Sequence, residues 1–202
     1  MRNISCASYV VYMEDDVKRL DDPRALRALA HPLRLRLLSA LRAEGPATVS
    51  TLADQVDESP ANVSYHLSKL HEHGFIEEAP ELARDGREHW WRAAHAYTSW
   101  TDVEPLDDPE RRIAANALTR TVLDRQREQI DRFVAEETAW GKEWVAAAQI
   151  SNDDTLRLDP AALAAMTAEL WAVIDKYKAQ EPAPDAERVR VIFHAFPQRR
   201  GS

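Results

Sequence analysis

Apolar residues recur at helical spacing in two short segments between residues 48 and 73. The first segment follows Thr48, a residue type that caps helices, and the second follows Ser59-Pro60, where serine caps and proline occupies the first helical position. Gly74 is placed to end the second helix. The apolar positions are Leu52, Ala53 and Val56 in the first helix and Val63, Leu67 and Leu70 in the second.

A segment rich in strand-forming residues comes directly after these helices. Phe75-Ile76 begins it, Asp85-Gly86 is a tight-turn signal, and His89-Trp90-Trp91 begins a second strand. The order helix, turn, helix, hairpin predicts a winged helix-turn-helix.

The chain before this region predicts one more helix and a leader. Asp22-Pro23 caps a leucine-rich helix, which Pro32 should kink or divide near His31, and Gly45-Pro46 ends it. Residues 1–17 show no sustained period, and we expect a disordered leader there. The alternative is that translation starts at Met13.

A long helix is predicted after the hairpin and a connector over residues 95–108. Asp108-Pro109 opens it and no helix breaker appears before Gly141, so a helix over residues 109–150 would span roughly 60 Å. A domain of this size cannot cover such a helix alone, so we expect a second subunit to pack on it. The expected dimerisation residues on its seam are Leu123, Ile130, Phe133, Trp140 and Trp144.

The C-terminal segment predicts a β-α-β unit. Residues 155–158 and 188–196 alternate like strands, and Asp159-Pro160 caps a helix between them. The expected fold is therefore mainly α with a small β content. We expect three parts: the leader (1–17), a winged helix-turn-helix domain (18–104), and a domain for dimerisation or regulation made of the long helix and the β-α-β unit (105–202).

The motifs in residues 23–92 resemble the ArsR-type branch of bacterial winged-helix repressors. The resemblance rests on three runs in the right order: ALAHPLRLRLL, then LADQVDESPANVSYHLSKLHEHGFIEE, then RDGRE on the wing. It implies a dimeric transcription regulator that binds an operator in double-stranded DNA. It does not identify an inducer.

Composition and charge narrow the setting. The 202 residues are 45% hydrophobic and 30% charged, and no apolar run approaches the ~18 residues of a membrane span. A single cysteine, Cys6, is consistent with a reducing cytoplasm.

The net charge of −8 works against a polyanionic partner. Residues 1–104 hold 12 Lys and Arg against 17 Asp and Glu, so a bulk positive field cannot supply DNA affinity. Binding would depend on local placement and be weak on random DNA. The alternative is a winged helix that binds proteins rather than DNA.

The face of the second helix opposite its apolar stripe is the expected DNA-reading surface. Asparagine can bond adenine in a bidentate way, serine reaches bases or phosphates, and alanine packs on a thymine methyl group. Arginines at the wing tip can meet a phosphate or enter a narrow minor groove. His66, next to Leu67, is interpreted as a half-buried side chain. The expected DNA contacts are Thr48, Ser59, Ala61, Asn62, Ser64, Tyr65, Ser68, Lys69, Arg84 and Arg87.

Other chemistries receive little support. The first helix holds no cysteine for a thiophilic metal, and His71 and His73 are two apart, so they do not share a helix face. No phosphate loop, nucleophile elbow or zinc-protease motif is present, so we expect no metal, cofactor or catalysis. A small organic effector stays open as a partner. Its pocket would be lined by Trp140, Trp144, Trp171 and Tyr177.

Overall fold

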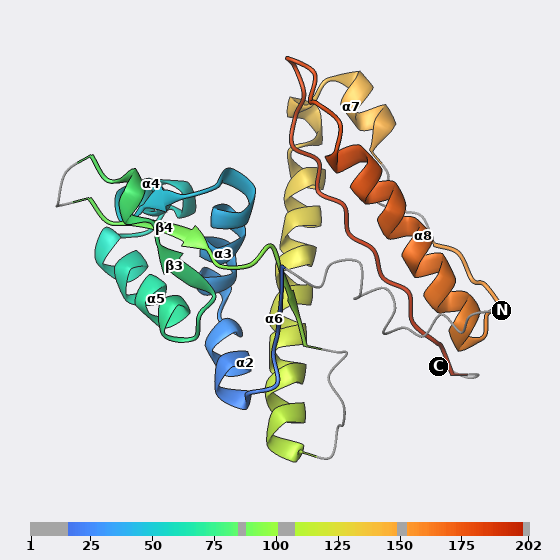
Figure 1. Cartoon of the computed structure of the whole chain (residues 1–202). Helices are drawn as coiled ribbons and strands as arrows, with labels where there is room; N and C mark the ends of the chain where they lie inside the picture. The colour runs from blue at the N-terminus through green and yellow to red at the C-terminus, as the bar shows by residue number, and fades with distance from the viewer. Residues whose placement is uncertain (1–15, 85–87, 101–107, 149–152, 200–202) are drawn as a thin grey trace. The chain divides into compact units, whose positions relative to one another are not determined.

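The computed structural model describes residues 16–84, 88–100, 108–148 and 153–199 and is shown in Figure 1. The chain divides into two compact units, one that ends at Val145 and one that continues from Ala146. The long helix therefore belongs with the N-terminal region, whereas the sequence grouped it with the tail.

Two helices open the first unit. Helix α2 (Pro23–Leu29) is capped by Asp22, whose Oδ1 accepts the N–H of Arg24 at 2.8 Å. Helix α3 (Pro32–Glu44) follows at once and is capped by the Nδ1 of His31. Because proline cannot continue the helix before it, the predicted division near His31 is confirmed. Gly45 ends α3 with a φ of 85°, a backbone conformation that favours glycine.

The two predicted short helices are confirmed. Helix α4 (Val49–Val56) is capped by Thr48 and helix α5 (Pro60–Glu72) by Ser59. Asp57 takes the left-handed conformation between them, with a φ of 51°, and turns the chain sharply. Helices α3, α4 and α5 pack on one another.

The predicted hairpin is part of a three-stranded antiparallel sheet. Strand β4 (Trp90–Ala93) lies between β2 (Ala47–Thr48) and β3 (Ile76–Glu78). Gly74, with a φ of 64°, makes the turn from α5 into β3. A short 3₁₀ helix, η2 (Pro80–Leu82), follows β3, and the tight turn predicted at Asp85-Gly86 lies outside the described residues.

A second sheet consists of two parallel strands, one from each end of this region of the chain. Strand β1 (Val17–Arg19) pairs with β5 (Tyr97–Ser99), within the segment expected to be an irregular connector. Arg42 of α3 holds β5 by donating to the carbonyl of His95 and the hydroxyl of Thr98. The leader expected over residues 1–17 lies outside the described residues up to residue 15, and Val17 is already in β1.

Helix α6 (Pro109–Ala135) packs on α2 through its first half. Ala114 and Leu118 are buried there, and the buried guanidinium of Arg111 donates to the carbonyls of Leu20 and Trp100. The start of α6 is thus fixed both to the chain before the helix-turn-helix, at Leu20, and to the chain after it, at Trp100.

The predicted uninterrupted helix to residue 150 is wrong. α6 ends at Ala135, a 3₁₀ helix η3 (Glu137–Ala139) follows, and α7 covers Lys142–Ala147. The break allows Trp140 to lie 6.5 Å from Phe133 and 6.3 Å from Trp144, measured between ring centroids. No glycine or proline lies between Pro109 and Gly141, so no helix-breaking residue marks the end of α6 at Ala135.

The second unit contains the predicted helix α8 (Pro160–Lys178), capped by Asp159. The prediction of two strands beside α8 is wrong, because residues 153–159 and 186–199 form no strand. Alternation alone does not make a strand, which also needs a hydrogen-bonded neighbour. Val189 and Val191 are exposed there.

The hydrophobic core lies in the first unit, between α2, α3, α4, α5 and α6, and helix α8 has no buried residue. Leucines dominate it, as their helical spacing predicts. Its largest fully buried side chains include Leu26, Leu37, Leu38, Leu52, Leu67, Leu70, Phe75, Ile76 and Leu118. This core holds α5 rigidly and leaves one face of that helix at the surface.

Candidate nucleic-acid interface

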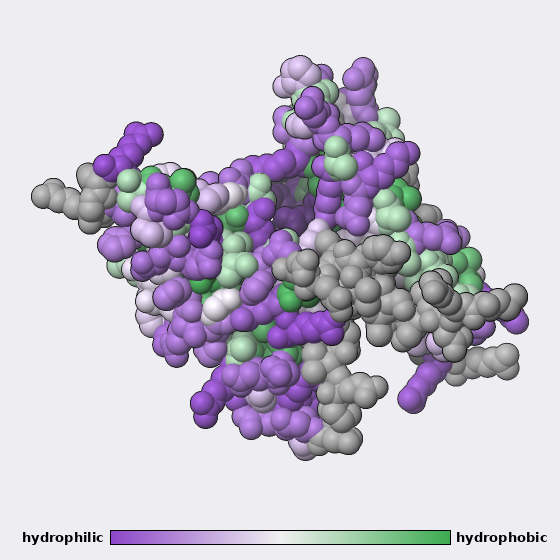
Figure 2. Space-filling view, in the orientation of Figure 1, coloured by the Kyte–Doolittle hydropathy of each residue, from purple (hydrophilic) through white to green (hydrophobic). Residues whose placement is uncertain are grey.

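Helix α5 presents one polar face to solvent. Val63, Leu67 and Leu70 are fully buried, as the apolar stripe predicts. On the opposite face Tyr65 is 58% exposed. The other exposed side chains of that face are Ala61, Ser64 and Ser68. The polar face is confirmed as a surface, and Figure 2 shows that hydrophilic residues dominate this side of the region.

Two of the expected contact residues are helix caps. The Oγ1 of Thr48 accepts the N–H of Thr51 and the Oγ of Ser59 accepts the N–H of Asn62, both at 3.2 Å. Capping uses a lone pair of each hydroxyl. The O–H of Ser59 therefore stays suited to donate to a phosphate at the entry of α5.

Asn62 makes a side-chain contact that the sequence pattern does not predict. Its Nδ2 donates to Oε2 of Glu58 at 2.9 Å. Glu58 was not among the expected site residues. Glu58 and Asn62 are four residues apart, a spacing that makes side chains neighbours within a helix. Glu58 precedes α5, so the spacing did not by itself predict the contact.

Lys69 forms an ion pair with Glu72 of the same helix. Its Nζ lies 2.7 Å from Oε2 of Glu72, one turn along α5. This hydrogen bond raises the pKa of Lys69 and lowers the pKa of Glu72. Both side chains are exposed, so a phosphate can compete with Glu72 for the ammonium group.

The wing has an ordered base of ion pairs. Glu88 accepts the backbone N–H of Arg84 and the Nε1–H of Trp90, each at 3.1 Å, and these bonds lower its pKa. Arg92 pairs with Glu77 at 2.6 Å and also with Glu81. The side chain of Arg84 is exposed, whereas Arg87 lies outside the described residues.

His66 lies beside the polar face of α5, on the buried side of the helix. It is 7% exposed, more deeply buried than expected, and its ring lies 4.4 Å from that of His31 at the start of α3. Burial lowers the pKa of both histidines, and the positive charge of Arg34 adds to the effect. His66 is therefore a packing residue that favours its neutral form.

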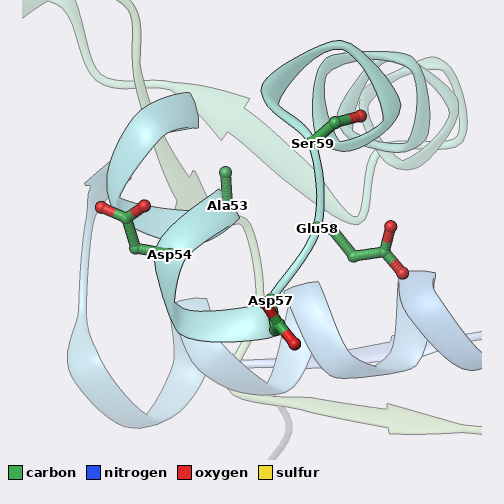
Figure 3. Close-up of a pocket in the computed structure, with 5 residues that line it drawn as sticks. All are labelled: Ala53, Asp54, Asp57, Glu58 and Ser59. Atoms are coloured by element: carbon green, nitrogen blue, oxygen red, sulfur yellow. The ribbon is translucent and has the colours of Figure 1, made fainter.

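The helix-turn-helix and wing are acidic. Residues 48–93 hold nine Asp and Glu against four Lys and Arg. The turn between α4 and α5 borders an open depression of about 480 Å³, lined by Ala53, Asp54, Asp57, Glu58 and Ser59 (Figure 3). Beside this turn, Arg36 of α3 donates to the carbonyl of Val56.

The expected dimerisation residues separate into two kinds. Leu123, Ile130 and Trp144 are exposed, the last two at 37%, while Phe133 and Trp140 are half-buried against each other. The expected effector pocket draws Trp171 and Tyr177 from the second unit and stays a prediction.

Within the described residues, no three His, Cys, Asp or Glu side chains gather in a way that could hold a metal ion. His71 instead packs edge-on against Trp91, with centroids 5.2 Å apart. None of the described helices is both long and apolar enough to cross a membrane.

Comparisons with solved structures give similarities of low identity. The apo form of a mutant of ZitR from Lactococcus lactis has a TM-score of 0.31 and 16% identity, covering 74% of this chain and 83% of that one. The transcriptional regulator PA4135 has a TM-score of 0.31 and 14% identity, covering 75% and 79%. RV1404 from Mycobacterium tuberculosis has a TM-score of 0.30 and 14% identity, covering 78% and 84%.

No curated protein matches this sequence. A family described as a helix-turn-helix domain matches residues 29–79, which begin at the end of α2 and reach past β3. This match falls on the helices and the turn described above, and the chain carries a helix-turn-helix domain there.

Proposed function

We propose that this chain is a sequence-specific DNA-binding regulator of transcription that acts as a homodimer. The polar face of α5 carries the proposal: a rigid, capped helix exposes small and hydrogen-bonding side chains in line, opposite a fully buried stripe. An α-helix of this kind fits the major groove, where base edges differ in donors and acceptors.

Each part of the surface has its own role in this proposal. Asn62, Ser64 and Tyr65 reach base edges, while Thr48, Ser59 and Lys69 meet the phosphates that flank them. Arg84 and Arg87 bring the wing to the backbone or the adjacent minor groove. Phosphate contacts hold the helix in register, and base contacts give the sequence preference.

The homodimer is supported by the apolar residues that α6 leaves exposed beyond its packing on α2. Leu123, Ile130 and Val134 are exposed along its second half. A second copy that covers them would present a second α5 to the DNA, with half-sites about one helical turn apart. We propose that such a dimer represses transcription by occupying DNA that the polymerase would otherwise use. The chain's single cysteine, Cys6, suits the reducing cytoplasm, where we expect it to act.

The acidic balance of residues 48–93 favours one alternative, a winged helix that binds a basic protein. If the protein binds DNA, the same excess of acidic residues has a different effect. It suppresses attraction to random DNA and leaves the contacts to matched bases to supply the affinity.

The test is selection from genomic DNA. Purified protein is mixed with fragmented genomic DNA at about 50 mM and about 200 mM salt, and retained fragments are sequenced. We expect enrichment of a short motif with two-fold symmetry that persists at the higher salt. Retention of no fragments at either salt would contradict DNA binding and favour the protein-binding alternative.

A further inference from the structure

We propose that Glu58 and Asn62 act together as one base-reading pair. The pair selects adenine or cytosine, the bases that carry an exocyclic amino group at the major-groove edge. This inference rests on the proposed DNA-binding function and adds the chemical class of base at one position of each half-site.

The backbone holds both residues in place before any DNA is bound. The end of α4 fixes Glu58, whose N–H donates to the carbonyl of Ala53 at 3.1 Å beyond the left-handed Asp57. The start of α5 fixes Asn62, whose N–H donates to the Oγ of Ser59 at 3.2 Å. The pair therefore bridges the turn from rigid positions on both sides.

The hydrogen bond between the side chains fixes how the amide faces. A carboxylate only accepts hydrogen bonds, so the nitrogen of Asn62, and not its oxygen, faces Oε2 of Glu58 at 2.9 Å. The Oδ1 of Asn62 is then directed away from Glu58. The pair as a whole offers oxygen acceptors and one remaining amide N–H.

This pattern of acceptors complements two of the four bases. In the major groove adenine presents its N6 amino group and cytosine its N4 amino group, whereas guanine O6 and thymine O4 are acceptors. An acceptor of the pair that meets guanine or thymine leaves two sets of lone pairs facing each other. Adenine is the fullest match, because its N7 can also accept the remaining N–H of Asn62.

The position of Glu58 explains how an acid is tolerated beside DNA. Its carboxylate lies at the N-terminus of α5, where the helix dipole favours a negative charge. Repulsion from phosphates still lowers affinity for every sequence, and only a base that donates to the pair offsets that loss. Rejection of wrong bases is a recognised route to specificity.

The main experiment compares base preferences. Wild-type protein, Glu58→Gln and Asp54→Asn each select from random double-stranded DNA, and the selected fragments are sequenced. Asp54→Asn is the matched control, since it removes one charge from the same turn and its carboxylate points to another side (Figure 3). Melting temperatures of the three proteins confirm that they are folded.

We expect wild type to prefer adenine or cytosine over guanine and thymine by at least about fivefold at one position per half-site. In Glu58→Gln that ratio should fall below about twofold, because glutamine can also donate, while binding to random DNA becomes tighter. Asp54→Asn should share the tighter binding and keep the preference.

A second experiment follows the pair in the free protein. The side-chain amide signals of Asn62 in an NMR spectrum should shift in Glu58→Gln and stay in place in Asp54→Asn. Unchanged signals in both variants would mean that the pair does not form, even if DNA binding stands.

A preference for guanine or thymine, or an unchanged preference in Glu58→Gln, would overturn the inference while leaving the proposed function intact. If the wild-type protein selects no sequence, the proposed function fails and this inference fails with it.

Discussion

Under the proposed function, different residues of this surface recognise the bases and bind the phosphate backbone. In the proposed complex Asn62, which is hydrogen-bonded to Glu58, would face the base edges, whereas Arg84 on the wing would meet phosphates, which carry no sequence information. Asn62→Ala should weaken binding to the selected operator by about 1–3 kcal/mol and change binding to random DNA little. Arg84→Ala should weaken both alike and lower the salt slope by about one ion. Titrations of both duplexes at several salt concentrations measure this, and equal weakening by Asn62→Ala would place the reading face elsewhere.

The buried histidines predict a dependence of stability on pH. Burial lowers the pKa of His31 and His66 in the folded protein, while the unfolded chain takes up protons at the ordinary value near 6.5. The unfolded state therefore binds more protons as the pH falls through that value, and the free energy of unfolding should decrease from pH 7.5 to pH 5.5. In urea titrations His66→Leu should reduce this decrease. A decrease as large in His66→Leu as in the wild type would contradict this explanation.

At the scale of elements, the turn between α4 and α5 depends on its cap. Ser59→Ala removes the acceptor for the N–H of Asn62 and should lower the free energy of unfolding by about 1 kcal/mol. Ser59→Asp, which keeps an acceptor, should lose much less. Chemical denaturation of the two variants provides the comparison, and equal losses would show that the hydroxyl is not needed as a cap.

Elements with local signals were predictable from the sequence, and elements that depend on distant partners were not. Thr48, Ser59 and Pro32 mark helix boundaries through their own chemistry, and all three boundaries are confirmed. The end of α6 at Ala135 has no glycine or proline to mark it, and β5 depends on pairing with β1. At the candidate site, the polar face of α5 followed from periodicity, but Glu58 required the geometry of the turn.

At the scale of the whole molecule, the second half of α6 is where we expect a second copy to pack. Ile130→Asp would bury a charge in that contact, at a cost of several kcal/mol, and should yield monomers with much weaker operator binding. Ile113, which is 69% exposed on the first half of the same helix, offers a matched control as Ile113→Asp. Light scattering measures the mass of both. A dimeric Ile130→Asp, or a monomeric Ile113→Asp, would place the interface elsewhere.

The buried Arg111 joins the carbonyls of Leu20 and Trp100, at the two ends of the region that contains the helix-turn-helix. Its guanidinium fixes the start of α6 to both ends of that region, and the second half of the helix leads toward the expected partner. In the proposed dimer, tilting α6 would change the separation of the two α5 helices. Under the proposed function, an effector that altered this separation would weaken DNA binding without contacting a residue that reads a base.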